Sequence, residues 1–93
     1  MDTSSRSLRI QSLCQQIAEI RDPEVIEALF EDLCTRKELE NMAERFFAAQ
    51  LLMEGKTYNQ VMSEADISSA TLSRVSRCVQ YGTGYRQVLK KEE

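Results

Sequence analysis

The chain has 93 residues, a net charge of −3, and neither histidine nor tryptophan. No apolar run approaches the ~18 residues of a membrane span, and the first residues lack the apolar region of a signal peptide. We therefore expect one soluble, cytoplasmic, all-α domain over residues 1–93.

Residues that carry chemistry are scarce. Cys14, Cys34 and Cys78 lie far apart without a CxxC spacing, so we expect buried, reduced, structural thiols and no zinc site. The commonest catalytic base, histidine, is missing. No glycine-rich phosphate loop and no pairing of a nucleophile with a base is found either. We expect no enzymatic activity, no catalytic residue, no metal and no cofactor.

The first predicted helix follows a few residues, 1–4, that we expect to fray. Ser4 or Ser5 would cap this helix, which is predicted to run to about Ile20. Its apolar stripe has helical spacing and consists of Ile10, Leu13, Cys14, Ile17 and Ile20.

A second helix is predicted over about residues 23–34, because Asp22 suits an N-cap and Pro23 a first helical position. One side of it is apolar, with Val25, Ile26, Leu29, Phe30 and Leu33. The other side is acidic and is expected to be solvated, with Glu24, Glu27, Glu31 and Asp32.

A longer third helix is predicted from Thr35 to about Glu54, where Thr35 and Glu38 form a capping box and Gly55 suits a left-handed residue. Its apolar residues spread over more than one side, which is typical of a central helix or of one packed on a second chain. They are Leu39, Met42, Ala43, Phe46, Phe47, Ala49, Leu51 and Met53, with Gln50 among them. Together with the first two stripes, this exceeds what one small core needs and predicts an intertwined homodimer.

The stretch from Thr57 to Gln80 is typical of a helix-turn-helix. Thr57 and Gln60 form a capping box for a helix over residues 58–65, and Ser68 caps a second helix over 69–80. At the turn, Asp66 replaces the usual glycine and tolerates a left-handed backbone, and Met62 replaces a usually small residue. Five residues are expected to form one small core: Val61, Ala65, Ile67, Leu72 and Val75.

The outward side of this motif favours DNA binding. Small and hydroxylated residues followed by arginines suit a helix that enters the major groove, and the start of the first motif helix suits a phosphate. We expect Arg74 to reach a guanine edge and Arg77 a phosphate. The predicted DNA-binding residues are Lys56, Thr57, Tyr58, Asn59, Ser68, Ser69, Ala70, Thr71, Ser73, Arg74 and Arg77. A purely structural helical pair is the alternative interpretation of the same pattern.

Charge is unevenly distributed along the chain. Residues 17–54 hold ten acidic and four basic residues, a net −6, whereas residues 66–91 hold five basic residues against Asp66, a net +4. DNA would meet the basic part. The basic residues are Arg74, Arg77, Arg86, Lys90 and Lys91. Residues 81–84 are expected to interrupt the helical pattern after the motif, and a short last helix is predicted over residues 85–90.

The segment LLMEGKTYNQVMSEADISSATLSRVSRCVQYGTGY resembles the YerC/YecD-type proteins of the Trp-repressor-like family, the TrpR superfamily. The resemblance runs from about Asp32 to Leu89 and is strongest over Gly55–Tyr58, Ala70–Val75 and Tyr81–Tyr85. It implies an all-α, intertwined homodimer in which the first helices of one chain wrap around the other. It also implies that the two helix-turn-helix units bind paired operator half-sites.

The same resemblance bears on a ligand. In tryptophan-binding members, an arginine in the second half of the motif holds the ligand carboxylate, and Arg74 falls at that place. A second arginine clamps the ligand from the central helix, where this chain has Glu44, with Arg45 one position further. An acid repels a carboxylate, so tryptophan is disfavoured and an unidentified small-molecule effector stays open. Arg74 is then expected to contact DNA or to pair with an acid.

Two functions from different classes follow. The first is a sequence-specific, repressor-like transcriptional regulator that binds operator DNA as a homodimer. The alternative is a dimeric protein-interaction module with a degenerate helix-turn-helix and no DNA function, whose natural surface would be the acidic side of residues 23–34.

Overall fold

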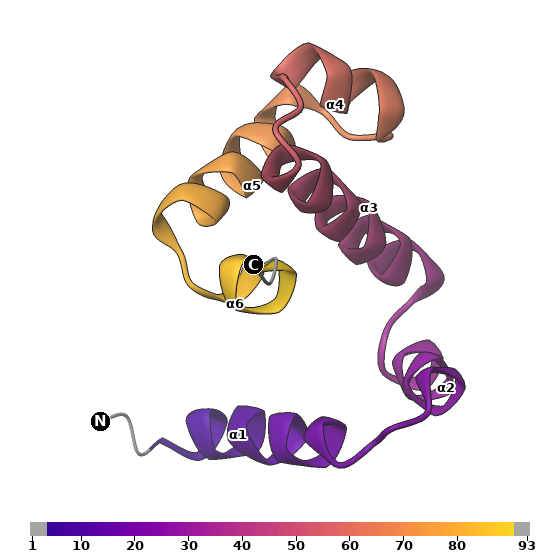
Figure 1. The fold of residues 1–93 in the computed structure, drawn as a ribbon. Coiled ribbons are helices and arrows are strands. Elements are labelled where there is room, and N and C mark those ends of the chain that lie inside the picture. The colour runs from indigo at the N-terminus through magenta and orange to yellow at the C-terminus, as the bar shows by residue number, and fades with distance from the viewer. Residues whose placement is uncertain (1–3, 91–93) are drawn as a thin grey trace. The chain divides into compact units, whose positions relative to one another are not determined.

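The computed structural model describes residues 4–90, and helices are the only regular secondary structure in that range. The predicted all-α class is confirmed. Residues 1–3, predicted to fray, and Lys91, counted with the basic residues, lie outside the described residues. No described helix is long and apolar enough to cross a membrane. In chain order the helices are α1 (Ser5–Ala18), α2 (Pro23–Leu33), α3 (Arg36–Met53), α4 (Tyr58–Glu64), α5 (Ser69–Tyr81) and α6 (Gly84–Leu89) (Figure 1).

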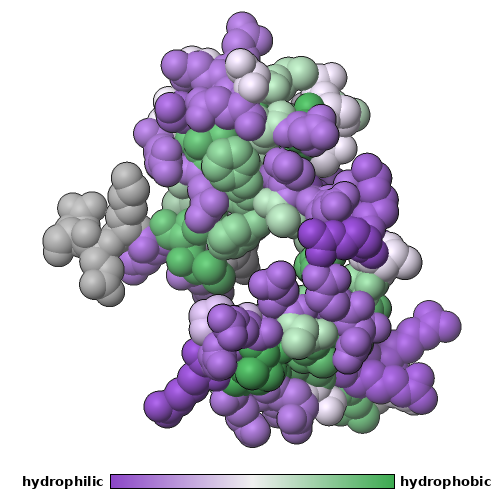
Figure 2. All heavy atoms as spheres, turned by 90° about the vertical axis from the view of Figure 1, so that its right-hand side faces the viewer, coloured by the Kyte–Doolittle hydropathy of each residue, from purple (hydrophilic) through white to green (hydrophobic). Residues whose placement is uncertain are grey.

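The chain divides into two compact units, Met1–Arg36 with α1 and α2, and Lys37–Glu93 with α3 to α6. Neither α1 nor α2 has a buried residue. Their apolar side chains lie at the surface, as the green atoms in the lower part of Figure 2 show, and Leu8, Ile10, Leu13, Val25 and Leu33 are all exposed. That the whole chain forms one domain stays a prediction.

The starts of α1 and α2 were predicted correctly. The Ser4 hydroxyl accepts a hydrogen bond from the Ser7 amide at 3.2 Å, and the Asp22 carboxylate accepts one from the Glu24 amide at 3.0 Å. The predicted end of the first helix at Ile20 was two residues too long. The amides of Glu19 and Ile20 bond three residues back, to Gln16 and Ile17, which tightens the last turn and ends α1.

The end of α3 follows the glycine signal. Gly55 has a φ of 95°, and the Lys56 amide reaches back to the Leu51 carbonyl at 3.1 Å, as in a Schellman motif. α3 is apolar on more than one side, as predicted. Ala48, Ala49 and Leu51 are buried, while other faces leave apolar residues exposed: Met42, Phe46 and Phe47.

The core of the second unit is where α3, α4 and α5 meet (Figure 1). The predicted five-residue core is confirmed, since Val61, Ala65, Leu72 and Val75 are buried and Ile67 packs against them from a partly buried position. α3 completes this core with Ala48, Ala49 and Leu51. Met62 is exposed, so its size does not hinder the approach of α4 to α5.

The turn between α4 and α5 differs from the expectation. No described residue other than glycine has a positive φ, so the left-handed backbone expected at Asp66 is not used. Ala65 and Ser68 are extended instead, and the Ile67 amide bonds the Ala65 carbonyl at 3.0 Å. A three-residue turn centred on Asp66 therefore reverses the chain without glycine.

The cysteines differ from the prediction of buried thiols. Cys14 and Cys78 are exposed and Cys34 is half-buried. Cys14 lies on α1, which buries nothing. Cys78 lies at the edge of the α5 side that faces the core, so its sulfur reaches the surface.

α6 begins one residue earlier than predicted and packs towards α3, where the rings of Tyr85 and Phe46 are 6.4 Å apart.

Candidate nucleic-acid interface

The outward side of α5 is a stripe of four residues, Ala70, Arg74, Arg77 and Tyr81, which we call the α5 stripe. Their spacing of four, three and four residues places them on one face of a helix. All four are exposed. The opposite face holds the buried Leu72, Val75 and Ser76. The core therefore fixes which side of α5 meets solvent.

The second half of the α5 stripe borders an open cleft of about 400 Å³, lined by Arg74, Arg77, Cys78, Tyr81 and Gly82. Neither arginine side chain forms an ion pair or a hydrogen bond with a described residue. The sequence has no acidic residue between positions 67 and 91. Two exposed guanidinium groups therefore border a cleft whose lining residues include no carboxylate, which suits an anion.

The start of α4 holds four of the predicted DNA-binding residues. Thr57 and Gln60 form the predicted capping box, with bonds of 2.8 and 3.2 Å between each side chain and the other's amide. Tyr58 and Asn59 are exposed. The Lys56 ammonium lies 3.5 Å from the Glu64 carboxylate, so part of its charge is already balanced within α4.

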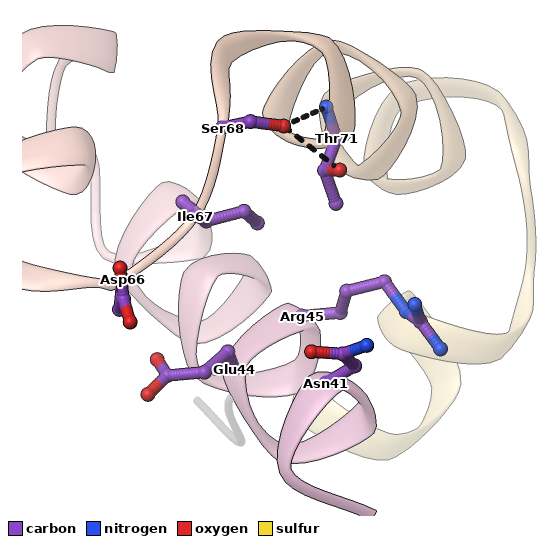
Figure 3. A pocket seen from close by; sticks show the side chains of 7 residues that line it. All are labelled: Asn41, Glu44, Arg45, Asp66, Ile67, Ser68 and Thr71. Carbon is purple, nitrogen blue, oxygen red and sulfur yellow. Dashed lines mark hydrogen bonds between the residues drawn. The ribbon is translucent and has the colours of Figure 1, made fainter. Parts of the chain in front are cut away.

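The start of α5 is built around Ser68 and Thr71. The Ser68 hydroxyl accepts from the Thr71 amide at 3.2 Å and donates to the Thr71 hydroxyl at 3.0 Å (Figure 3). Both side chains therefore already serve the cap. Ser69 and Ser73 are exposed and their hydroxyls form no hydrogen bond with a described residue, so these hydroxyls are available to a ligand.

A second cavity, of about 160 Å³, lies between α3 and the turn that precedes α5 (Figure 3). Glu44 and Arg45 line it from α3 and Asp66 from the turn, so its lining residues include two carboxylates and one guanidinium. Its remaining walls are Asn41, Ile67, Ser68 and Thr71. Arg74 lines the α5 cleft instead, so neither of these two cavities contains both Arg74 and Glu44.

No group of three or more cysteine or acidic residues within residues 4–90 is placed to hold a metal ion. Beside the α5 cleft lies a mostly apolar cavity of about 470 Å³, lined by Phe46, Cys78, Tyr85, Val88 and the residues of the α5–α6 corner. Its walls offer apolar contact and no ionised side chain, so it is suited to packing against another apolar surface.

Sequence reasoning missed Tyr81. It was placed in the break after the motif, but the structure includes it as the last residue of α5 and leaves its side chain 80% exposed. The signal was present in the spacing, because Tyr81 follows Ala70 by eleven residues, which is three helical turns. An exposed tyrosine at the end of a cationic stripe can donate a hydrogen bond to a phosphate.

Comparisons with known proteins agree with this geometry. The sequence profile of the family described as Trp repressor protein matches residues 8–93. The YerC protein of Bacillus subtilis, described as uncharacterized, is 39% identical over 77 residues, which cover 83% of this chain and 74% of that protein.

Two solved structures are similar. One is the crystal structure of a candidate Trp repressor from Staphylococcus aureus, with a TM-score of 0.82 and 31% identity over 88% of this chain and 83% of that one. The other is a TrpR-like protein from Eubacterium eligens, with a TM-score of 0.83 and 34% identity over 89% of this chain and 87% of that one.

Proposed function

The chain belongs to the Trp repressor family, and we propose that it is a sequence-specific, repressor-like transcriptional regulator that binds operator DNA as a homodimer. The observation that carries the proposal is the α5 stripe. It is exposed, it holds two arginines whose side chains have no partner among the described residues, and it lies in a stretch of 25 residues, 67–91, without an acidic residue. Such a regulator would work in the cytoplasm, where it meets DNA.

The geometry of α5 indicates which of its residues would contact base edges. In a helix-turn-helix the first residues of the second helix reach base edges, and here these are Ser69, Ala70 and Ser73. Arg74 lies one turn beyond Ala70, about 6 Å along the axis, and remains within reach of a guanine edge. Lys56 and Asn59, at the start of α4, would lie against the sugar–phosphate backbone.

The homodimer is supported by the apolar surface that a single chain leaves exposed. The first unit buries no residue of its helices, and α3 exposes Phe46 and Phe47. A second copy would cover such surface and double the core. Two copies would also place two α5 stripes on one DNA duplex, and the modest net charge of +4 over residues 66–91 of each chain requires this for useful affinity.

We propose that tryptophan is not an effector of this protein. The 160 Å³ cavity is smaller than the ~300 Å³ at which sites for drug-sized ligands begin. Glu44 and Asp66 outnumber Arg45 in it, so an amino-acid carboxylate would be repelled. An effector of different chemistry stays compatible with the proposal. Isothermal titration calorimetry with tryptophan checks this, and specific micromolar binding would contradict it.

The test of DNA reading compares Arg74→Ala with Lys56→Ala on an operator selected from random sequences and on unselected DNA. Losing a bidentate contact to guanine costs roughly 1–3 kcal/mol and relaxes discrimination at one base pair. We expect Arg74→Ala to remove most of the preference for the operator. Lys56→Ala is expected to weaken both DNAs equally and modestly, since Glu64 already balances part of its charge.

The alternative function has its own outcome in this experiment. If neither substitution changes binding to any DNA while circular dichroism shows a folded helical protein, the protein-interaction module becomes the better interpretation. Its surface would be the acidic side of α2, where Glu24, Glu27, Glu31 and Asp32 are all exposed.

A further inference from the structure

We propose that Arg77 and Tyr81, which line the α5 cleft, hold one phosphodiester group of the DNA backbone at the wall of the major groove. This inference rests on the proposed function. It adds Tyr81 to the DNA-binding residues and states which part of α5 meets the DNA backbone. The cleft would seat the DNA strand that borders the groove on the side away from the start of α5. The same contact would set how far α5 enters the groove.

The length of α5 supports this contact. From Ala70 to Tyr81, the α5 stripe extends about 16 Å along the helix axis. The major groove of B-DNA is only about 12 Å wide. A helix that crosses the groove with Ala70 at the base edges therefore brings Tyr81, eleven positions further on, to the groove wall, where the phosphates lie. Arg74 stays inside the groove, and Arg77, about 10 Å from Ala70, lies at its edge.

The donor groups of Arg77 and Tyr81 also suit a phosphate. Arg77 offers a planar set of donors that matches two phosphate oxygens, and it has no partner among the described residues. The Tyr81 hydroxyl is a further donor of the kind that contacts phosphates, on a side chain that is 80% exposed. No carboxylate of α5 or α6 competes, because neither helix contains one.

The surface around the two residues is hollowed. Arg74, Arg77 and Tyr81 border a shallow, open cleft of about 400 Å³. Cys78 and Gly82 also line this cleft, and Gly82 has no side chain to fill it. A phosphodiester with its sugar can therefore lie against the cleft, while an extended flat surface would offer the arginine alone.

Cys78 provides a direct probe of this contact, because its free thiol is exposed and lines the cleft. The experiment follows alkylation of the unaltered protein by iodoacetamide, residue by residue, by mass spectrometry. We expect a saturating mixed-sequence DNA duplex to slow alkylation of Cys78 severalfold and to leave Cys14, on α1, at its original rate. Inorganic phosphate at equal ionic strength serves as the free-anion comparison, and we expect it to give little protection.

Two matched pairs of variants complete the test on the same duplex. Arg77→Gln is compared with Arg86→Gln, which removes the same charge from α6. Arg77→Gln should reduce the slope of log affinity against log salt by about one, and Arg86→Gln by less. Tyr81→Phe removes only a hydroxyl and should lower affinity about three- to tenfold. Tyr85→Phe, outside the α5 stripe, should leave affinity unchanged.

The outcomes separate this inference from the function on which it rests. If the duplex binds but Cys78 reacts at its original rate, and each variant behaves like its control, the cleft assignment is overturned and the regulator proposal stands. Equal protection by inorganic phosphate would mark a free-anion site and also overturn it. If the protein binds no duplex even at low salt, both the regulator proposal and the cleft assignment fail. Because the labelling uses the unaltered chain, the conclusion does not depend on the folding of any variant.

Discussion

Gly82 closes α5 in a conformation that most residues adopt, with φ −87° and ψ −173°. Its constraint is steric: a Cβ at this position would lie 2.7 Å from the Cys78 carbonyl oxygen, which is backbone and cannot turn away. The Gly82 amide bonds that same oxygen at 2.9 Å. Any side chain here must therefore shift the corner between α5 and α6.

We expect Gly82→Ala to lower the free energy of unfolding by about 1–3 kcal/mol, the usual cost of forcing atoms into occupied space. Gly84→Ala is the matched control, because nothing lies within 4 Å of a Cβ there and its φ is not positive. Its stability should be unchanged or slightly higher. Urea unfolding followed by circular dichroism measures both, and equal stability of the two variants would refute the steric argument.

Single residues also show how exposure can mislead a sequence reading. Cys78 sits among apolar residues in the sequence, yet it is exposed and borders the α5 cleft. Tyr81 was treated as part of a chain break and is instead the last residue of the α5 stripe. Tyr81 lies at the very end of α5, where a shift of one residue in the helix boundary decides whether the helical spacing applies.

At the scale of one element, α4 shows how local bonds can stabilise a short helix. Seven residues are too few for a helix to be stable alone in water. Its first turn is closed by the reciprocal bonds of Thr57 and Gln60, and Val61 anchors it in the core. The capping box and one buried side chain therefore position the start of α4, where a phosphate is expected.

Thr57→Ala removes the hydroxyl that accepts the Gln60 amide, and we expect a loss of about 0.5–2 kcal/mol of stability. Ser63→Ala is the control, because Ser63 is exposed on the same helix and its hydroxyl forms no hydrogen bond with a described residue. Thermal unfolding followed by circular dichroism reports both changes. If the two variants melted at the same temperature, the capping box of Thr57 and Gln60 would not stabilise the protein.

At the scale of the whole molecule, the apolar surface decides the expected assembly. Seven apolar side chains are buried among the described residues, and all lie between Ala48 and Val75. Such a core is small for a chain of this length. Helices α1 and α2 bury nothing within the single chain, so they are expected to become buried only against a second copy.

Sedimentation equilibrium at micromolar concentration should therefore give twice the chain mass of 10.7 kDa. A mass of one chain would rule out the homodimer in that range.

Residues 1–34 are likewise expected to be required for folding, since they would supply much of the shared core. A shortened chain that begins at Thr35 should lose its cooperative thermal transition, and a sharp transition in that chain would contradict the expectation.

The sequence by itself determined the features that depend on neighbours a few residues away. The caps at Ser4, Asp22, Thr57 and Ser68 were predictable because each bonds an amide two or three residues further on. The left-handed Gly55 and the core side of α5 followed from equally local rules, backbone freedom and helical spacing. The candidate DNA-binding residues on α5 were predictable for the same reason.

Only the tertiary structure decided which surfaces remain exposed and which side chains share a cavity. Three features depend on how α3, α4 and α5 meet: the turn centred on Asp66, the exposure of Cys78, and the position of Arg74 and Glu44 at different cavities. Burial and cavities arise from contacts between residues distant in the sequence, and those contacts have no local period. That is why the direction of the α5 stripe could be predicted, while the cleft at its end could not.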